Sequence, residues 1–202
     1  MTKGQRKGAS SGHRIDRTTK TGSFAFVEVF RGFEGVEAVR SIFLDQTERI
    51  LGDLMVDILP RPGYLHVDDE TGNIVVSSQY LRTGDERYLY LDVIHELVHI
   101  RQFIEGKELF DSRYSYVDRP TEIEAYSAAT REAERIGMKK KEILDYLKVE
   151  WVTEEEFQRL LRAVGFDAGR SCARCLVSTR APQRVSVSLC PSSQNRFRRA
   201  GH

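Results

Sequence analysis

The chain has 202 residues, 30% of them charged and 40% hydrophobic, and is long enough to bury a core. Its net charge of +1 is unevenly distributed, since residues 1–22 carry +5, residues 167–202 carry +6 and the segment between them carries −10. The N-terminus lacks an apolar run long enough for a signal peptide, and no later segment is apolar enough to span a membrane. These features argue against a membrane or secreted protein and predict a cytoplasmic one with a single acidic domain.

The two basic ends of the chain are expected to be disordered. Residues 1–22 consist largely of Gly, Ser, Thr, Lys and Arg, and residues 167–202 are rich in Ser and Arg. Such compositions bury too little apolar surface to offset the entropy of ordering, so we place the folded domain at residues 23–166. All three cysteines lie in the C-terminal segment, at Cys172, Cys175 and Cys190. The domain therefore cannot depend on disulfides, and the cysteine spacing completes no common structural zinc module.

The first half of the domain reads as a helix and three short strands. An aromatic and β-branched run at residues 24–30 predicts an edge strand. Apolar residues at helical spacing over residues 36–54 predict an amphipathic helix that ends before Pro60. Two β-rich runs, residues 64–68 and 74–80, flank a glycine-containing turn and predict a hairpin.

The second half is predicted to be helical. A 3.6-residue period predicts a long helix over residues 86–104, and a mixed loop follows at residues 107–119. Further helices are predicted at residues 120–136, with Pro at the start and Gly after the end, and at residues 141–147 and 154–164. This order predicts an α+β domain, with a short antiparallel sheet before the long helix and a helical C-terminal part.

The long helix contains the sequence His95-Glu96-Leu97-Val98-His99. Residues four apart lie on one face of a helix, so His95 and His99 can direct two imidazoles at one metal ion, with Glu96 on the neighbouring flank. At 100° per residue the two histidines fall opposite the main apolar stripe. An isolated histidine is usually an ordinary core or surface residue, but the whole pattern on a two-faced helix favours a zinc site.

Zinc bound by two histidines needs at least one more protein ligand. No histidine follows His99 until His202, which leaves a carboxylate, and the next helix offers Glu122 and Glu124. Glu122 aligns with the apolar stripe of that helix, whereas Glu124 points the opposite way. The alignment favours Glu122, although attraction to the helix dipole would account for either acid.

The zinc motif followed by Glu122 on a second helix resembles the gluzincin metallopeptidases. The hairpin before the motif and the Glu-x-Glu-Ala segment at residues 122–125 are also similar to the compact ImmA/IrrE family. This resemblance covers roughly residues 63–136. It implies a small zincin-like fold, a Zn²⁺ cofactor and, as the third ligand, the first glutamate of the segment, Glu122.

The sequence therefore predicts a zinc-dependent peptidase that acts on a peptide or protein substrate. In such a site zinc lowers the pKa of its water to about 7, and Glu96 takes the proton and relays it to the leaving amine. The strand at residues 74–80 could pair with an extended peptide at its edge. Asp92, one turn before His95, could orient a ligand, although an aspartate in such a position is more often simply solvated. The donor to the oxyanion stays open among four residues: Tyr114, Tyr116, Tyr126 and Arg101.

Two other functions fit the sequence. The first is a non-enzymatic domain that zinc stabilises and that binds a protein partner through the same cleft. The second is an association with nucleic acid through the basic ends, because lysine and arginine contact phosphates without sequence preference. No aromatic interleaving and no nucleic-acid motif accompany those basic residues, which weakens the second alternative.

Overall fold

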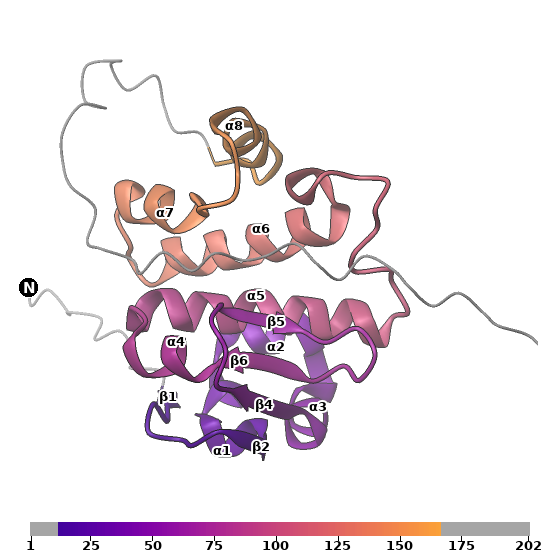
Figure 1. Cartoon of the computed structure of the whole chain (residues 1–202), viewed down its shortest axis with the longest axis vertical. Coiled ribbons are helices and arrows are strands. Elements are labelled where there is room, and N and C mark those ends of the chain that lie inside the picture. The colour runs from indigo at the N-terminus through magenta and orange to yellow at the C-terminus, as the bar shows by residue number, and fades with distance from the viewer. Residues whose placement is uncertain (1–11, 167–202) are drawn as a thin grey trace, which may run out of the picture.

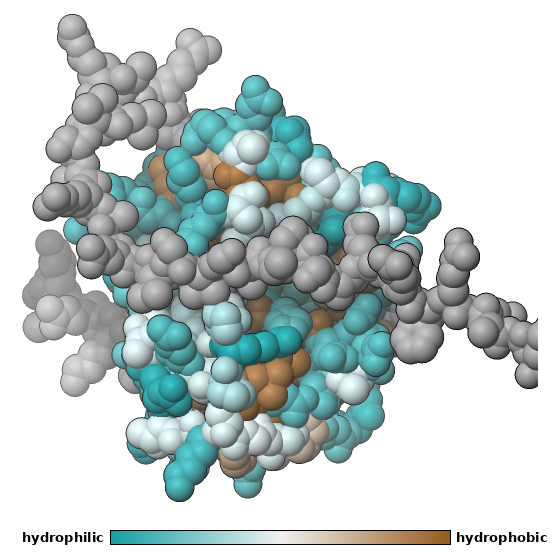
Figure 2. All heavy atoms as spheres, in the orientation of Figure 1, coloured by the Kyte–Doolittle hydropathy of each residue, from teal (hydrophilic) through white to brown (hydrophobic). Residues whose placement is uncertain are grey.

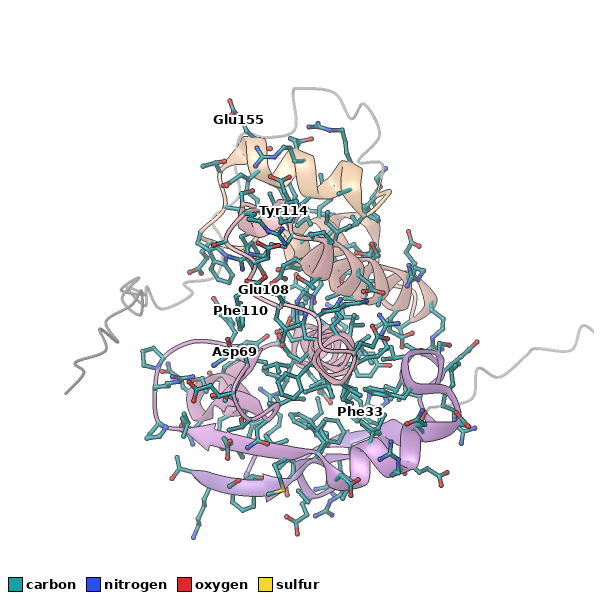
Figure 3. All side chains as sticks on the ribbon, turned by 90° about the vertical axis from the view of Figure 1, so that its right-hand side faces the viewer. Phe33, Asp69, Glu108, Phe110, Tyr114 and Glu155 are labelled. Atoms are coloured by element: carbon teal, nitrogen blue, oxygen red, sulfur yellow. The ribbon has the colours of Figure 1, made fainter. Side chains whose placement is uncertain are left out.

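The computed structural model describes residues 12–166, which form a mixed α/β structure with a four-stranded sheet and a larger helical part (Figure 1). Helix α5 crosses the middle of the molecule, with the sheet on one side and helices α6, α7 and α8 on the other (Figure 1). Seen from the side in Figure 3, the sheet forms the base and α8 the opposite end. Helix α5 therefore lies between the two halves, where residues on its surface can meet both.

The strand order in the main sheet is β2-β4-β6-β5. Its members are β2 (Gly22–Ala25), β4 (Met55–Leu59), β6 (Ile74–Ser77) and β5 (Leu65–Val67). Strands β2 and β4 are antiparallel, β4 and β6 parallel, and β5 and β6 antiparallel. The expected antiparallel sheet is therefore a mixed one. The β5–β6 hairpin is confirmed, but β4 was missed and it separates β2 from the hairpin.

The N-terminal boundary differs from the expected one. Strand β1 (Arg14–Ile15) pairs with β3 (Phe30–Arg31), so order begins within the segment expected to be disordered. The Arg17 guanidinium donates to the carbonyl oxygens of Leu81, Arg82 and Gly84 at 3.0, 2.9 and 2.5 Å. These long-range hydrogen bonds satisfy the carbonyls at the end of α4 and offset the low apolar content of the segment. Residues 1–11 lie outside the described part.

The edge strand expected at residues 24–30 is confirmed only for Phe24 and Ala25, which belong to the edge strand β2. Strand β2 ends at Ala25, and a short helix α1 (Phe26–Val29) follows before β3. The side chains of Phe26, Val29 and Phe30 are fully buried. Their i, i+3, i+4 spacing lets one helical turn put all three in the core, which an alternating strand would not do.

The predicted helix over residues 36–54 is divided into two. A 3-10 turn η1 (Phe33–Gly35) leads into α2 (Glu37–Phe43), and a second turn η2 (Leu44–Gln46) leads into α3 (Thr47–Asp53). Leu44, at the break, has φ 55° and ψ −128°, which is not helical. The change of direction lets α2 pack against α5 and α3 pack against α1, and the chain then enters β4.

The remaining helices follow the predicted order. Strand β6 ends earlier than expected, at Ser77, and α4 (Ser78–Thr83) follows it directly. The chain then enters α5 (Glu86–Ile104). Asp85 caps the start of α5 by accepting hydrogen bonds from the N–H groups of Arg87 and Tyr88. Residues 107–119 form a loop, as expected, and its one regular element is the 3-10 turn η3 (Tyr116–Asp118). Three helices complete the described chain: α6 (Pro120–Arg135), α7 (Lys140–Leu147) and α8 (Glu154–Ala163).

The core lies between the sheet and α5 and continues between α5 and the C-terminal helices. Phe33, labelled in Figure 3, lies between the sheet and α5 and is fully buried. Hydrophilic residues cover most of the face seen in Figure 2. Within residues 12–166, no helix is both long and apolar enough to cross a bilayer. The C-terminal segment that was predicted to be disordered, residues 167–202 with the three cysteines, lies outside the described residues.

Candidate metal centre

The structure brings His95, His99 and Glu122 together in the interface between α5 and α6. Both histidines are on α5, one turn apart, and Glu122 is in the first turn of α6. Their exposed fractions are only 6%, 6% and 4%. These three side chains form a buried group that could hold a metal ion.

The distances within this group match those between zinc ligands. His95 Nε2 lies 3.0 Å from His99 Nε2, and Glu122 Oε2 lies 3.3 and 3.6 Å from those two nitrogens. In a tetrahedral site with bonds of about 2.0–2.1 Å, ligand atoms are roughly 3.3–3.4 Å apart. Two imidazoles and one carboxylate also suit zinc chemically. The residues present therefore fit the ion, with one tetrahedral position left over.

Gln102 fixes the orientation of the His99 ring. Its Oε1 lies 2.7 Å from His99 Nδ1, and its Nε2 donates to the carbonyl oxygen of Thr121 and to Glu124. Because an amide oxygen only accepts, His99 Nδ1 carries a proton, so in the neutral ring the lone pair is on Nε2, which is directed at the group. By contrast, His95 Nδ1 has no hydrogen-bond partner among the residues described.

The two carboxylates that the sequence left open have different surroundings. Glu124 binds Arg101 and Gln102 and lies 3.5 Å from Lys107, so cations and an amide already satisfy it. Glu122 Oε2 is buried and has no well-formed hydrogen bond within the described part of the chain. Its polar neighbours are the two imidazoles, at 3.3 and 3.6 Å, and a bound cation would give this buried oxygen the close partner that no hydrogen bond supplies.

The buried histidines and Glu122 shift one another's pKa values. Burial would raise the pKa of Glu122, but the adjacent His95 and His99 outweigh burial and lower it to about 2. Burial would lower the pKa of His99, but the Glu122 and Glu96 carboxylates outweigh it and raise this pKa to about 9. The pKa of His95 is lowered, chiefly by burial. Without a metal, His99 and Glu122 thus form an ion pair, and metal binding would displace the proton.

Glu96 is buried beside the group but does not belong to it. Its exposed fraction is 6%, and the backbone N–H of Val67 in β5 donates to its carboxylate. Burial raises its pKa to about 8. Its Oε2 has no hydrogen-bond partner among the described residues, so one oxygen is free to accept a proton.

Two pockets adjoin at this group. The tyrosine pocket extends from His95 and Glu96 past Asp92 toward Tyr146, and the metal-side pocket extends past Glu122 toward Leu109. Five residues line both: Leu65, His95, Glu96, Tyr116 and Trp151. The pair forms one cleft along α5, with β5 on one wall.

Trp151 lines the cleft between two tyrosines. Trp151 is on the connection between α7 and α8, and its ring lies 5.9 Å from that of Tyr64 and 6.0 Å from that of Tyr116. The hydroxyl groups of Tyr116 and Tyr126 are 2.7 Å apart, and the Tyr126 ring lies 4.4 Å from the His95 ring. A reacting group at His95 would therefore have two phenols close by.

The remaining predicted residues lie in different places. Asp92 lines the tyrosine pocket and accepts from the Tyr80 hydroxyl at 2.5 Å. It does not orient either histidine through Nδ1, since His99 Nδ1 pairs with Gln102 and His95 Nδ1 has no hydrogen bond among the described residues. Arg101 is paired with Glu124, and Tyr114 is exposed on the loop between α5 and α6 (Figure 3). Strand β6, expected to offer an edge to a peptide, lies inside the sheet, and β5 is the edge strand instead.

Sequence reasoning missed Gln102 and Trp151. Gln102 is a polar residue one turn after His99 on the same helix face, which is a signal that could have identified it. Trp151 comes from a connection between two short helices, and no local pattern places it near α5.

Comparison of the chain with protein-family models, curated proteins and solved structures finds no match. The function is therefore argued from the geometry of His95, His99, Glu122 and Glu96 in their cleft.

Proposed function

We propose that the chain is a zinc-dependent peptidase. The observation that carries the proposal is the set of three donor atoms at zinc-ligand spacing, next to a buried carboxylate with a free oxygen, in a cleft. A structural zinc site takes four protein ligands, whereas three ligands with an open position suit catalysis. The edge strand beside the helix that carries both histidines supports a zincin-like arrangement.

The roles of the residues follow from their positions. His95, His99 and Glu122 would hold zinc, and Gln102 would keep His99 Nε2 directed at it. When bound, zinc supplies a Lewis acid that polarises the scissile carbonyl and makes a water nucleophilic at neutral pH. Glu96 takes the proton of the attacking water at its free Oε2 and passes it to the leaving amine. Burial raises the pKa of Glu96 and so favours the protonated form that the second step requires, whereas the charge of a bound metal ion would favour the carboxylate that the first step requires.

The cleft suits an extended peptide. Strand β5 is paired on one side only, with β6, and Leu65 and Val67 line the cleft on its other side. A peptide main chain could add to that edge, as strands add to sheet edges in other peptide-binding proteins. Of the four candidate oxyanion donors, Tyr116 lines both pockets and Tyr126 lines the tyrosine pocket. We assign the donor role to Tyr116, since its hydroxyl group is held by Tyr126.

The Glu96→Gln substitution tests this proposal. Zinc-loaded wild-type protein should hydrolyse members of an internally quenched peptide library, and Glu96→Gln should lower kcat/KM at least about 100-fold, because the amide cannot accept the proton. The variant should keep its zinc, since Glu96 is not a ligand. Glu105→Gln, at the exposed end of α5, is the matched control and should leave kcat/KM unchanged.

Two results would contradict the proposal. Undiminished hydrolysis by Glu96→Gln would remove the mechanism. Absence of hydrolysis by wild-type protein that contains stoichiometric zinc would favour the non-enzymatic, zinc-stabilised domain instead.

A further inference from the structure

The tyrosine pocket has an unusual lining. Six of the eight tyrosines of the chain line it, together with its only tryptophan, Trp151. Aromatic faces carry a negative quadrupole and attract cations placed over them, at about 6 Å or less from the ring centroid. An aromatic lining alone would accept either an apolar side chain or a cation.

The charged groups of the pocket distinguish these two occupants. Asp92, Glu96 and Glu150 line it, and no lysine or arginine does so among residues 12–166. Glu96 is assigned to the reaction, which leaves Asp92 and Glu150 as two further negative charges. A pocket walled by tyrosines with two such carboxylates attracts a cation and disfavours an anion.

Asp92 is held in place on the wall formed by α5. The Tyr80 hydroxyl donates to Asp92 Oδ2 at 2.5 Å, and the Tyr146 hydroxyl also bonds this carboxylate. Both donors are neutral phenols, so they orient the carboxylate without cancelling its charge. Its position, one turn before Glu96, puts this charge next to the proposed reaction centre.

The metal-side pocket provides the internal contrast. Beyond the candidate ligands and Glu96 it is lined mainly by uncharged residues, among them Val67, Leu109 and Phe110. The carboxylates outside the proposed reaction centre are thus confined to the tyrosine pocket, and the two ends of the cleft would accept different side chains.

We propose that the tyrosine pocket binds the basic side chain, Arg or Lys, of a peptide residue next to the scissile bond. The cleavage preference rests on the proposed peptidase function, whereas the binding of a cation does not. The guanidinium or ammonium group lies among the tyrosine rings and pairs with Asp92, with Glu150 at the rim adding attraction from its exposed position.

Trp151 allows a direct binding test, because it is the only tryptophan and lines the pocket. Full-length zinc-loaded protein is titrated with N-acetyl-arginine amide and N-acetyl-lysine amide while Trp151 fluorescence is recorded. The matched neutral ligands are N-acetyl-citrulline amide and N-acetyl-norleucine amide. We expect the cationic ligands to bind at least about tenfold more tightly than their neutral partners. Equal affinities, tighter binding of the neutral ligands or no response to either cation would overturn the proposal.

Substitutions identify the carboxylates responsible. Asp92→Asn should weaken binding of the arginine ligand at least fivefold, and Glu150→Gln, at an exposed site, roughly threefold. If Asp92→Asn fails to fold, the test rests on Glu150→Gln alone. An affinity of this variant for the arginine ligand equal to that of the wild-type protein would then overturn the proposal. Asp145→Asn on α7 is the control: it removes an exposed carboxylate that pairs with Lys141 and does not line the pocket.

A hydrolysis experiment separates this proposal from the peptidase function. Internally quenched peptides that differ only by arginine or citrulline next to the scissile bond should differ at least tenfold in kcat/KM. Cation binding without cleavage of any peptide would contradict the peptidase function and leave the pocket assignment intact. Cleavage without preference for arginine would overturn the pocket assignment and leave the function intact.

Discussion

Gln102 connects the two helices that contribute the candidate ligands. It has no exposed surface, contacts His99 on α5, and donates to the carbonyl oxygen of Thr121 and to Glu124 on α6. The same amide thus sets the His99 ring and holds the first turn of α6 next to it. A residue with this position affects metal binding without touching the metal.

Replacing Gln102 should therefore weaken zinc binding. We expect Gln102→Ala to lower zinc affinity by roughly 10–100-fold, the usual effect of removing a group that orients a ligating histidine. The measurement is a competition titration against a chromophoric chelator. Gln158→Ala, at an exposed position of α8, should change nothing. An affinity within twofold of wild type, in a variant whose circular dichroism is unchanged, would show that Gln102 has no such role.

At the scale of single residues, the sequence was informative where helical periodicity applies. The i, i+4 spacing predicted that His95 and His99 share a face, and the apolar stripe of α6 favoured Glu122 over Glu124; both arrangements are found. The sequence could not predict that Tyr116 lines the cleft and Tyr114 is exposed, because both lie on a loop without a period. Trp151 could not be placed either, since its neighbours Tyr64 and Tyr116 are far away in sequence.

Among the elements, the break between α2 and α3 contains the least favourable backbone conformation. Leu44 has φ 55° and ψ −128°, a region that glycine occupies readily and other residues rarely, and its side chain is 72% exposed. The residue thus carries backbone strain without the compensation of a buried side chain.

We expect Leu44→Gly to raise the free energy of unfolding by about 1 kcal/mol, because glycine relieves the strain and little buried apolar surface is lost. Urea denaturation followed by circular dichroism measures the change. Leu44→Ala removes the same side chain and keeps the strained backbone, so it should give no gain. Equal effects of both substitutions, or a loss of stability in Leu44→Gly, would show that the break is not strained.

The errors at this scale have a common physical cause. The hairpin and the long helices were predicted, because turn residues and periodicity are local signals. Strand β4 was missed, and α2 and α3 were merged, because tertiary packing decided both: β4 inserts between β2 and β6, and the two helices pack on different elements, α2 on α5 and α3 on α1. The ordered N-terminal segment was missed for the same reason, since Arg17 is anchored by carbonyls more than 60 residues away.

On the scale of the whole molecule, the candidate metal centre joins two halves. The histidines belong to α5, which packs on the sheet, and Glu122 belongs to α6, which packs with α7 (Figure 1). An ion held by both helices would stabilise the folded chain by mass action, because the unfolded chain does not preserve the site.

Removing zinc should accordingly destabilise the protein. Free zinc at 100 times its dissociation constant should raise the free energy of unfolding by about 2.7 kcal/mol. For a domain of this size, that corresponds to a rise in Tm of roughly 5–10 °C. Thermal unfolding in zinc and in a chelator measures the difference. Glu122→Gln should largely abolish it, whereas Glu134→Gln, at an exposed site on α6, should retain it. A Tm that does not respond to zinc in wild type would contradict the link between metal and fold.

The central claim is that His95, His99 and Glu122 form one zinc site, and the zinc content of the purified full-length chain tests it most directly. Elemental analysis should find one zinc per chain in wild-type protein and almost none after combined His95→Ala and His99→Ala substitution, with the fold checked by circular dichroism. Absence of stoichiometric zinc from wild-type protein, even after incubation with excess zinc, would contradict the claim. Full retention of zinc by the double variant would contradict it equally.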